Sequence, residues 1–193
     1  RAYESVQSRD GARLNDEQRA VLEHALAEFR LAGVALTGEK KERFRVVMLE
    51  LSSLAAKFEE NVLDATKAFT HHVTDAKDLD GLNPTILVQA RERAVSEGKE
   101  GWVLGLEQPT YVAVMTDARS PALRQLYYRA WSTRASDQGP TPASFDNTRV
   151  MEDLLRLRHE AAQLLDFPNY AAYALARRMA RSVDEVLKFL HDM

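Results

Sequence analysis

Cysteine is absent from the 193 residues, and glycine and proline are scarce. The missing cysteines exclude disulfides, cysteine-ligated zinc and thiol catalysis. The 8 glycines and 6 prolines make up about 7% of the chain, against about 12% in average proteins. Isoleucine occurs once, as Ile86, beside 27 alanines and 24 leucines. So few turn residues and β-branched residues count against a β-sandwich or barrel, and the surplus of alanine and leucine predicts a mainly helical fold.

A strong net charge and long apolar runs are missing as well. The 26 Lys+Arg residues nearly balance the 29 Asp+Glu residues, which leaves a net charge of -3 and no electrostatic reason to expect nucleic acid. No apolar run approaches the ~18 residues that a membrane helix needs. The first residues, Arg1 to Glu4, have none of the features of a signal peptide. We therefore expect neither a nucleic acid nor a membrane as partner, and a cysteine-free chain fits the cytoplasm.

Two long amphipathic helices are predicted in the first third of the chain. Asn15 is suited to cap a helix that ends at Gly33. A second helix begins near Thr37 and continues to about Ala65, with apolar residues at steps of three and four. Because the link between them is short, the two helices are expected to pack antiparallel. The first ten residues lack periodicity, and we expect residues 1–13 to be poorly ordered.

The middle of the chain has a different pattern. Residues 69–73 and 102–106 are β-prone, and their pairing predicts a small β-hairpin or short sheet on a helical body. Residues 111–115 fit a third strand, although Pro109 fits the start of a helix equally well. The pairs Asn83-Pro84 and Ser120-Pro121 each combine an N-cap with a proline at the first helical position, and so predict two more helices.

The last third is again helical, with predicted helices over residues 145–165 and 171–179. Ser182 and Glu185 form a capping box that opens a final helix. The chain has no initiator methionine and stops at Met193 inside this helical pattern. We interpret residues 1–193 as a single helical segment of a longer protein. The predicted fold class is mainly α, with long antiparallel helices and a small β element in the middle.

One stretch resembles half of a zinc-binding motif. In HExxH, two histidines on one helix face bind Zn²⁺ and the glutamate acts as general base. Here His159 and Glu160 are followed by Gln163 at the fifth position, where a neutral amide is a poor zinc ligand. We therefore predict that His159 and Glu160 are not a zinc site. No glycine-rich phosphate loop and no GxSxG elbow occurs anywhere in the chain.

The end of the helix that begins at Ser120 is the most promising place for a binding site. Three polar residues there, Arg134, Asp137 and Gln138, occupy a loop at a helix end, and such loops often line clefts. They are candidates to line a cleft, although a plain helix-terminating loop is the simpler interpretation. The aromatic residues just before them have two interpretations as well, as core residues or as a ligand platform. They are Tyr127, Tyr128 and Trp131.

Several stretches resemble, in the same order, the N-terminal half of the thimet-oligopeptidase family of zinc metallopeptidases. Together they cover nearly the whole chain from about Leu14, and one of them is a 13-residue near-match. The stretches are residues 14–19, 61–66, 128–140, 145–147 with 157–160, and 163–167 with 169–171.

This resemblance implies a nearly all-helical, two-lobed peptidase whose lobes flank a deep channel that admits short peptides. It makes Arg134, Asp137 and Gln138 the predicted channel-lining residues. The zinc ligands and general base of the family lie on an HExxH helix C-terminal to everything present here. The chain therefore resembles the pre-catalytic part, and no catalytic or metal-binding residue can be carried onto it. His159 and Glu160 match a non-catalytic His-Glu pair of the family. The resemblance implies zinc in the full-length protein, none in this chain, and no activity of this chain alone.

The implied partners are the C-terminal catalytic part of the same polypeptide and short peptide substrates. A face turned toward an absent half should be unusually apolar, so self-association of the isolated chain is left open. The alternative from another class is a self-contained helical module that binds a protein partner and has no catalytic activity.

Overall fold

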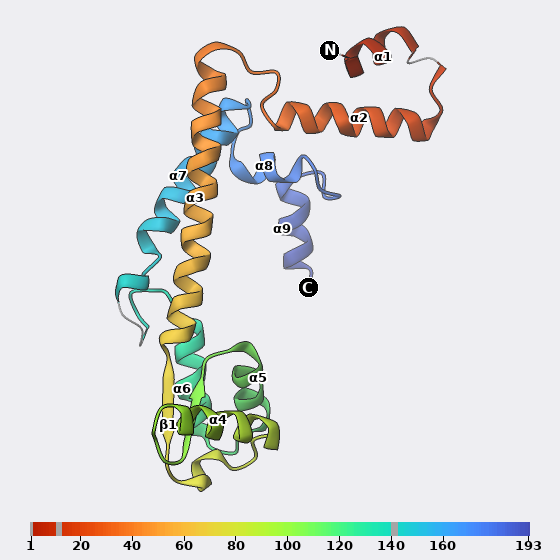
Figure 1. Ribbon diagram of the computed structural model, residues 1–193. Helices are drawn as coiled ribbons and strands as arrows, with labels where there is room; N and C mark the ends of the chain where they lie inside the picture. Colours follow the sequence, from red (N-terminus) through yellow and green to blue (C-terminus); the bar gives the residue numbers. More distant parts are fainter. Residues whose placement is uncertain (1, 11–12, 140–142) are drawn as a thin grey trace. The chain divides into compact units, whose positions relative to one another are not determined.

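The computed structural model describes residues 2–10, 13–139 and 143–193. Within these ranges the chain forms nine α-helices and one two-stranded antiparallel sheet (Figure 1). The predicted mainly helical fold with a small β element is thereby confirmed. Among the helices of the described ranges, none is long and apolar enough to cross a membrane.

The chain divides into two compact units, the first made of Arg1–Ser53 and Asp153–Met193. Its first helix was not predicted, because Ala2–Asp10 has no apolar periodicity to announce it. Its helices are α1 (Ala2–Asp10), α2 (Asp16–Leu31), the first part of α3 (Gly38–Ala68), the second part of α7 (Thr148–Leu164), α8 (Tyr170–Leu175) and α9 (Val183–His191).

Helix α2 does not lie along α3, as had been expected from their short link. Figure 1 shows α2 running across the direction of α3. The link makes this turn at Gly33, whose φ of +73° places it in the left-handed region. A Cβ atom at this position would collide with the buried ring of Phe44, so the turn packs directly against the start of α3. Only Leu22 and Leu31 of α2 are buried, which leaves no continuous stripe to pack along a second helix.

The long antiparallel partner of α3 is α7. In the first unit, Arg43 of α3 forms an ion pair with Glu160 of α7, with Nε and Oε1 2.5 Å apart. In the second unit, Asn61 of α3 donates a hydrogen bond to Asn147, the residue before α7, at 2.8 Å. A residue early in α3 thus meets one late in α7, and a later residue of α3 meets the start of α7. The predicted antiparallel helices exist, but with a different partner.

Leu54–Glu152 form the second compact unit, which contains the sheet. Strand β1 (Thr70–Val73) pairs with β2 (Trp102–Gly105), and the register places Thr70 opposite Gly105. The predicted pairing of the two β-prone runs is confirmed. The other elements of this unit are the end of α3, η2 (Ala76–Leu79), α4 (Pro84–Ser96), α5 (Gln108–Asp117), α6 (Pro121–Ser132), η3 (Ala143–Phe145) and the start of α7.

Residues 111–115, which fitted either a strand or a helix, belong to helix α5. Pro109 lies in the first turn of this helix, where its missing N–H has no partner to lose. Helices α4 and α6 begin as predicted. Asn83 accepts a hydrogen bond from the backbone of Thr85, and Ser120 accepts one from Leu123.

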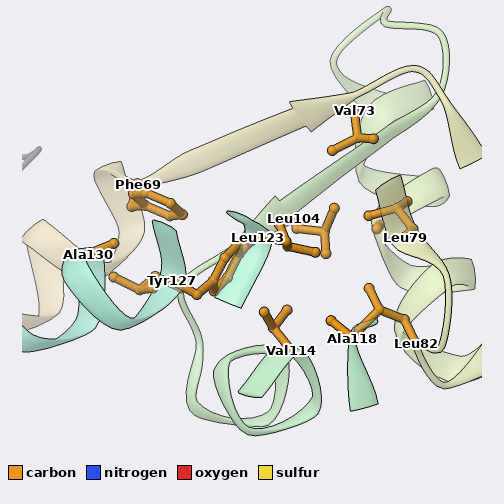
Figure 2. Packing of buried hydrophobic residues seen from close by; sticks show 12 residues of the cluster. Phe69, Val73, Leu79, Leu82, Leu104, Val114, Ala118, Leu123, Tyr127 and Ala130 are labelled. Carbon is orange, nitrogen blue, oxygen red and sulfur yellow. The ribbon is translucent and has the colours of Figure 1, made fainter. Parts of the chain in front are cut away.

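The core of the second unit is a cluster of buried side chains that includes Tyr127 (Figure 2). The Tyr127 ring is fully buried and meets the ring of Phe69 edge-on, with centroids 5.5 Å apart. Burial raises the pKa of the Tyr127 phenol, and its hydroxyl has no hydrogen-bond partner among the described residues. The other members of the cluster are Val73, Leu79, Leu82, Ala90, Leu104, Leu106, Val114, Ala118, Leu123 and Ala130.

Two substitutions of Tyr127 separate the roles of its ring and its hydroxyl. Tyr127→Ala is expected to destabilise the protein by about 3–5 kcal/mol, because it removes a buried ring and leaves a cavity. Tyr127→Phe keeps the ring and removes an unpaired hydroxyl, so its free energy of unfolding should stay within about 0.5 kcal/mol of wild type or rise. Urea unfolding followed by circular dichroism measures both. A loss above about 1 kcal/mol for Tyr127→Phe would contradict the assignment of an unpaired hydroxyl.

Candidate functional site

The predicted channel loop follows α6 and is positioned by the packing of that helix. Leu123, Tyr127 and Ala130 form one buried stripe at steps of four and three residues. This stripe fixes the rotation of α6 and leaves Trp131, the next residue, half-buried at the edge of the core. The helix ends at Thr133, whose backbone N–H and hydroxyl both donate to the carbonyl of Arg129.

Trp131 is the middle of a three-part stack. The ring of Tyr111, from α5, lies nearly parallel to it, with centroids 4.4 Å apart and planes 13° apart. The guanidinium carbon of Arg134 lies 3.6 Å from the Trp131 centroid. Two groups this close to one ring cannot share a face, so Tyr111 and Arg134 cover opposite faces of the indole. We call Tyr111, Trp131 and Arg134 the aromatic–arginine stack.

Arg134 is held without a polar partner among the described residues. Its Nη1 is buried and makes no hydrogen bond, and no carboxylate forms an ion pair with the guanidinium. Burial lowers the pKa of Arg134, and the neighbouring Tyr111 opposes that shift only in part. The cation–π contact with Trp131 is the interaction that holds the charge in place.

Asp137 and Gln138 are exposed and bonded to each other rather than to Arg134. The Gln138 side-chain amide donates to the Asp137 carboxylate at 3.0 Å. Ser136 shapes this part of the loop, since its hydroxyl donates to the carbonyl of Thr133 and accepts from the backbone of Gln138. The structure thus joins Arg134 to the aromatic side chains and places the other two predicted channel residues on the loop surface. Their role in a channel stays a prediction.

The loop is also tied to the start of α7 by two buried amide side chains that sequence reasoning missed. The backbone N–H of Asn147 donates to the carbonyl of Ala135, which has a left-handed φ of 52°. The Asn147 side chain accepts from Asn61 and donates to the carbonyl of Phe58. Asn61 and Asn147 are both buried. Each belongs to a stretch that carried the family resemblance, which was the only signal that pointed to them.

A second polar group lies in the same unit, beside a pocket of about 290 Å³. Arg93 of α4 and Glu107 form an ion pair at 2.5 Å over Gly105 of β2. A Cβ atom on Gly105 would collide with both side chains, so this position has room for the ion pair only because it is glycine. Because the pair is already satisfied internally, it offers no free charge to a ligand.

His159 and Glu160 lie on α7 in the first unit and do not face a common metal site. His159 is exposed. Glu160 accepts two hydrogen bonds from Arg43, at 2.5 and 2.8 Å, and these hold the pKa of its carboxyl below the usual range. The Gln163 amide donates to the carbonyls of Phe167 and Pro168, where the chain leaves α7. The contacts of Glu160 and Gln163 therefore suit a structural role.

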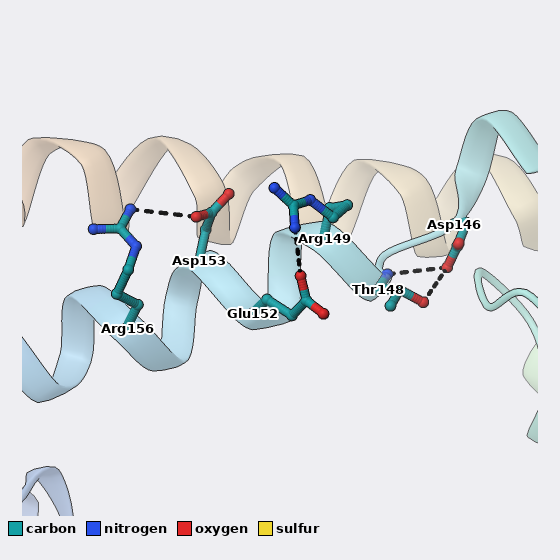
Figure 3. A network of polar contacts seen from close by, with 6 residues as sticks. All are labelled: Asp146, Thr148, Arg149, Glu152, Asp153 and Arg156. Atoms are coloured by element: carbon teal, nitrogen blue, oxygen red, sulfur yellow. Dashed lines mark hydrogen bonds and ion pairs between the residues drawn. The ribbon is translucent and has the colours of Figure 1, made fainter.

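Other carboxylates on α7 form ion pairs with arginines of their own helix (Figure 3). Glu152 pairs with Arg149 at 2.8 Å, and Asp153 pairs with Arg156 at 3.2 Å. Asp146 caps the helix by accepting from both the backbone N–H and the hydroxyl of Thr148. These acidic residues belong to a solvated helix face.

The two histidines of strand β1, His71 and His72, point to opposite sides of the sheet, as adjacent residues of a strand do. His71 is half-buried with its ring edge-on to Tyr127, and burial lowers its pKa. His72 is exposed and its Nε2 lies 2.6 Å from the carbonyl of Glu100. Across the part of the chain that the structure describes, no three histidine or acidic side chains come together as metal ligands.

Comparison with known proteins identifies peptidase relatives along the whole chain. Residues 114–193 match the model of Peptidase family M3. The chain is 44% identical over its entire length to oligopeptidase A of Escherichia coli, of which it covers 28%. It is 38% identical to the organellar oligopeptidase A of Arabidopsis thaliana, covering 24%, and 32% identical to a dipeptidyl carboxypeptidase of Salmonella typhimurium, covering 27%. The chain thus spans about a quarter of the length of these relatives, and the family resemblance found in the sequence is confirmed.

The ion pair between Arg43 and Glu160 predicts a pH-dependent contribution to stability. Because the folded-state pKa of Glu160 is depressed, this contribution is present above the unfolded-state value of about 4.5 and is lost as the pH falls through the folded-state value. Wild type should therefore be slightly more stable than Glu160→Gln at pH 7, and the difference should vanish in acid.

Urea unfolding between pH 3 and pH 7 measures this difference. Glu23→Gln on α2 is the matched control, since it removes an exposed carboxylate that has no ion pair in the described residues. A difference between wild type and Glu160→Gln that grows as the pH falls would show that the pair does not stabilise the fold.

Proposed function

From its place among the oligopeptidase A relatives in peptidase family M3, we propose that the chain is the N-terminal, pre-catalytic part of a zinc-dependent oligopeptidase. In this proposal it supplies scaffold and the wall of a substrate channel to a cytoplasmic enzyme that hydrolyses short peptides. The observation that carries the proposal is the alignment of the entire chain with 28% of a longer oligopeptidase at 44% identity.

Within the described part of the chain, the residues of the HExxH-like stretch do not fit a zinc ion. Gln163 holds the end of α7, Glu160 is paired with Arg43, and His159 stands alone at the surface. In the family, zinc activates a water molecule for attack on the peptide carbonyl. We therefore assign to this chain the positioning of substrate, and no step in bond cleavage.

The catalytic part of the same polypeptide is the proposed partner of this chain. Helix α9 supports that role, because it presents apolar side chains that the first unit does not cover. Leu187, Phe189 and Leu190 are 49%, 63% and 60% exposed. Leu187 and Leu190, three residues apart, lie on one face of the helix, and exposed apolar side chains of this kind are typical of an interface. The alternative function, a helical module that binds another protein without catalysis, would use the same face.

The two functions differ in a peptidase assay on two purified polypeptides. The complete product of the gene should hydrolyse an internally quenched peptide of about ten residues, and a chelator should abolish the activity. The polypeptide of residues 1–193 should leave the same peptide intact. A chelator-insensitive complete protein, or hydrolysis by residues 1–193 alone, would contradict the proposal. Absence of peptidase activity from the complete protein would favour the interaction module.

A further inference from the structure

The guanidinium of Arg134 differs from three arginines that form tertiary ion pairs in this structure. Arg43, Arg93 and Arg177 each lie 2.5 Å from a carboxylate. Arg134 meets no carboxylate within the described residues, although it is half-buried. A partly desolvated cation without an anion is destabilising, and the fold retains it against the face of Trp131.

The surroundings of Arg134 supply no acceptor for its N–H groups among the described residues, and Nη1 is buried. The carbonyl groups at the end of α6 would be natural acceptors for a cation at a helix C-terminus. Two of them accept hydrogen bonds from other residues, the carbonyl of Arg129 from Thr133 and the carbonyl of Thr133 from Ser136. The nearby acidic residue, Asp137, instead accepts from Gln138. No described residue accepts a hydrogen bond from the guanidinium.

We propose that Arg134, held against the face of Trp131, binds a carboxylate group of a peptide ligand. This inference rests on the proposed function, from which it takes the ligand class. It adds the group of the ligand that is recognised and the residue that recognises it. The shared chemistry is a carboxylate, which a peptide offers either at its C-terminus or on an acidic side chain.

The geometry suits that chemistry. A guanidinium is planar and presents a fork of N–H donors that matches the two oxygens of a carboxylate. Trp131 lies against Tyr111 on one side and Arg134 on the other, and these contacts restrain the guanidinium before the ligand arrives. Less side-chain freedom is then lost on binding. The half-buried position strengthens a charge-assisted hydrogen bond relative to one formed in open water.

The test uses the complete protein and a set of three peptides of equal length. The first has a free C-terminus and one acidic side chain, the second has an amidated C-terminus, and the third has glutamine in place of the acidic residue. The variants are Arg134→Gln, which removes the charge, and Arg134→Lys, which keeps the charge and loses the fork. Arg91→Gln is the matched control, because Arg91 also stacks on a tryptophan, at 5.6 Å from the Trp102 ring.

Arg134→Gln should raise KM for the first peptide about tenfold or more and leave kcat nearly unchanged, as expected when a charged hydrogen bond is lost. Arg134→Lys should give a smaller increase, and Arg91→Gln none. One of the two modified peptides lacks the carboxylate that Arg134 recognises, and wild type and Arg134→Gln should bind that peptide equally well. This result shows whether the recognised carboxylate is the C-terminus or the acidic side chain. Equal losses for all three peptides, or no change in any KM, would overturn the inference.

Calorimetric titration of the same peptides separates this inference from the proposed function. If the complete protein binds the first peptide through Arg134 but cleaves none of the three, the peptidase proposal fails and carboxylate recognition is supported. If all three are cleaved and the titrations of wild type and Arg134→Gln coincide, the peptidase proposal is supported and the assignment of Arg134 is wrong.

Discussion

The burial of one stripe of α6 is the constraint on which the second unit depends. Tyr127 lies at its centre, with Leu123 on one side and Ala130 on the other, and all three are almost completely buried. The Tyr127 ring meets Phe69 just before β1, so the same contact positions the strand that pairs with β2. Once α6 is fixed in rotation, Trp131 is placed at the edge of the core and Arg134 follows on its outer face. The candidate binding residue is thus set by packing rather than by the loop.

Polar contacts fix the antiparallel register of α3 and α7 separately in each unit. In the second unit the contact is a buried pair of amides, Asn61 and Asn147, with a backbone carbonyl of α3 as a further acceptor. Buried amides are stable only when their donors and acceptors are paired, so a shifted register would leave them unsatisfied. In the first unit the contact is the exposed pair of Arg43 and Glu160. Glu160 of this pair belongs to the HExxH-like stretch. Its ion pair with Arg43 accounts for the conformation of the glutamate without a metal ion.

Helix starts were predictable from sequence because their signals are local. Asn15 and Ser120 cap the helices that were predicted to begin after them, and each cap bonds to the backbone of its own first turn. Packing partners were not predictable in the same way. The short link after α2 suggested an antiparallel pair, yet the close approach of Gly33 to Phe44 turns the chain elsewhere. The loop with Arg134 was singled out correctly as polar and at a helix end. The contact of Arg134 with Trp131 could not be predicted, because the supporting ring of Tyr111 comes from another helix, α5.

The central claim is that this chain positions substrate for chemistry carried by residues outside it. The metal content of two purified polypeptides, measured by mass spectrometry under native conditions, tests it most directly. The complete protein should carry one zinc ion, and residues 1–193 should carry none, since His159, Glu160 and Gln163 are exposed or engaged in structural contacts. One tightly bound zinc ion in the polypeptide of residues 1–193 would contradict the claim.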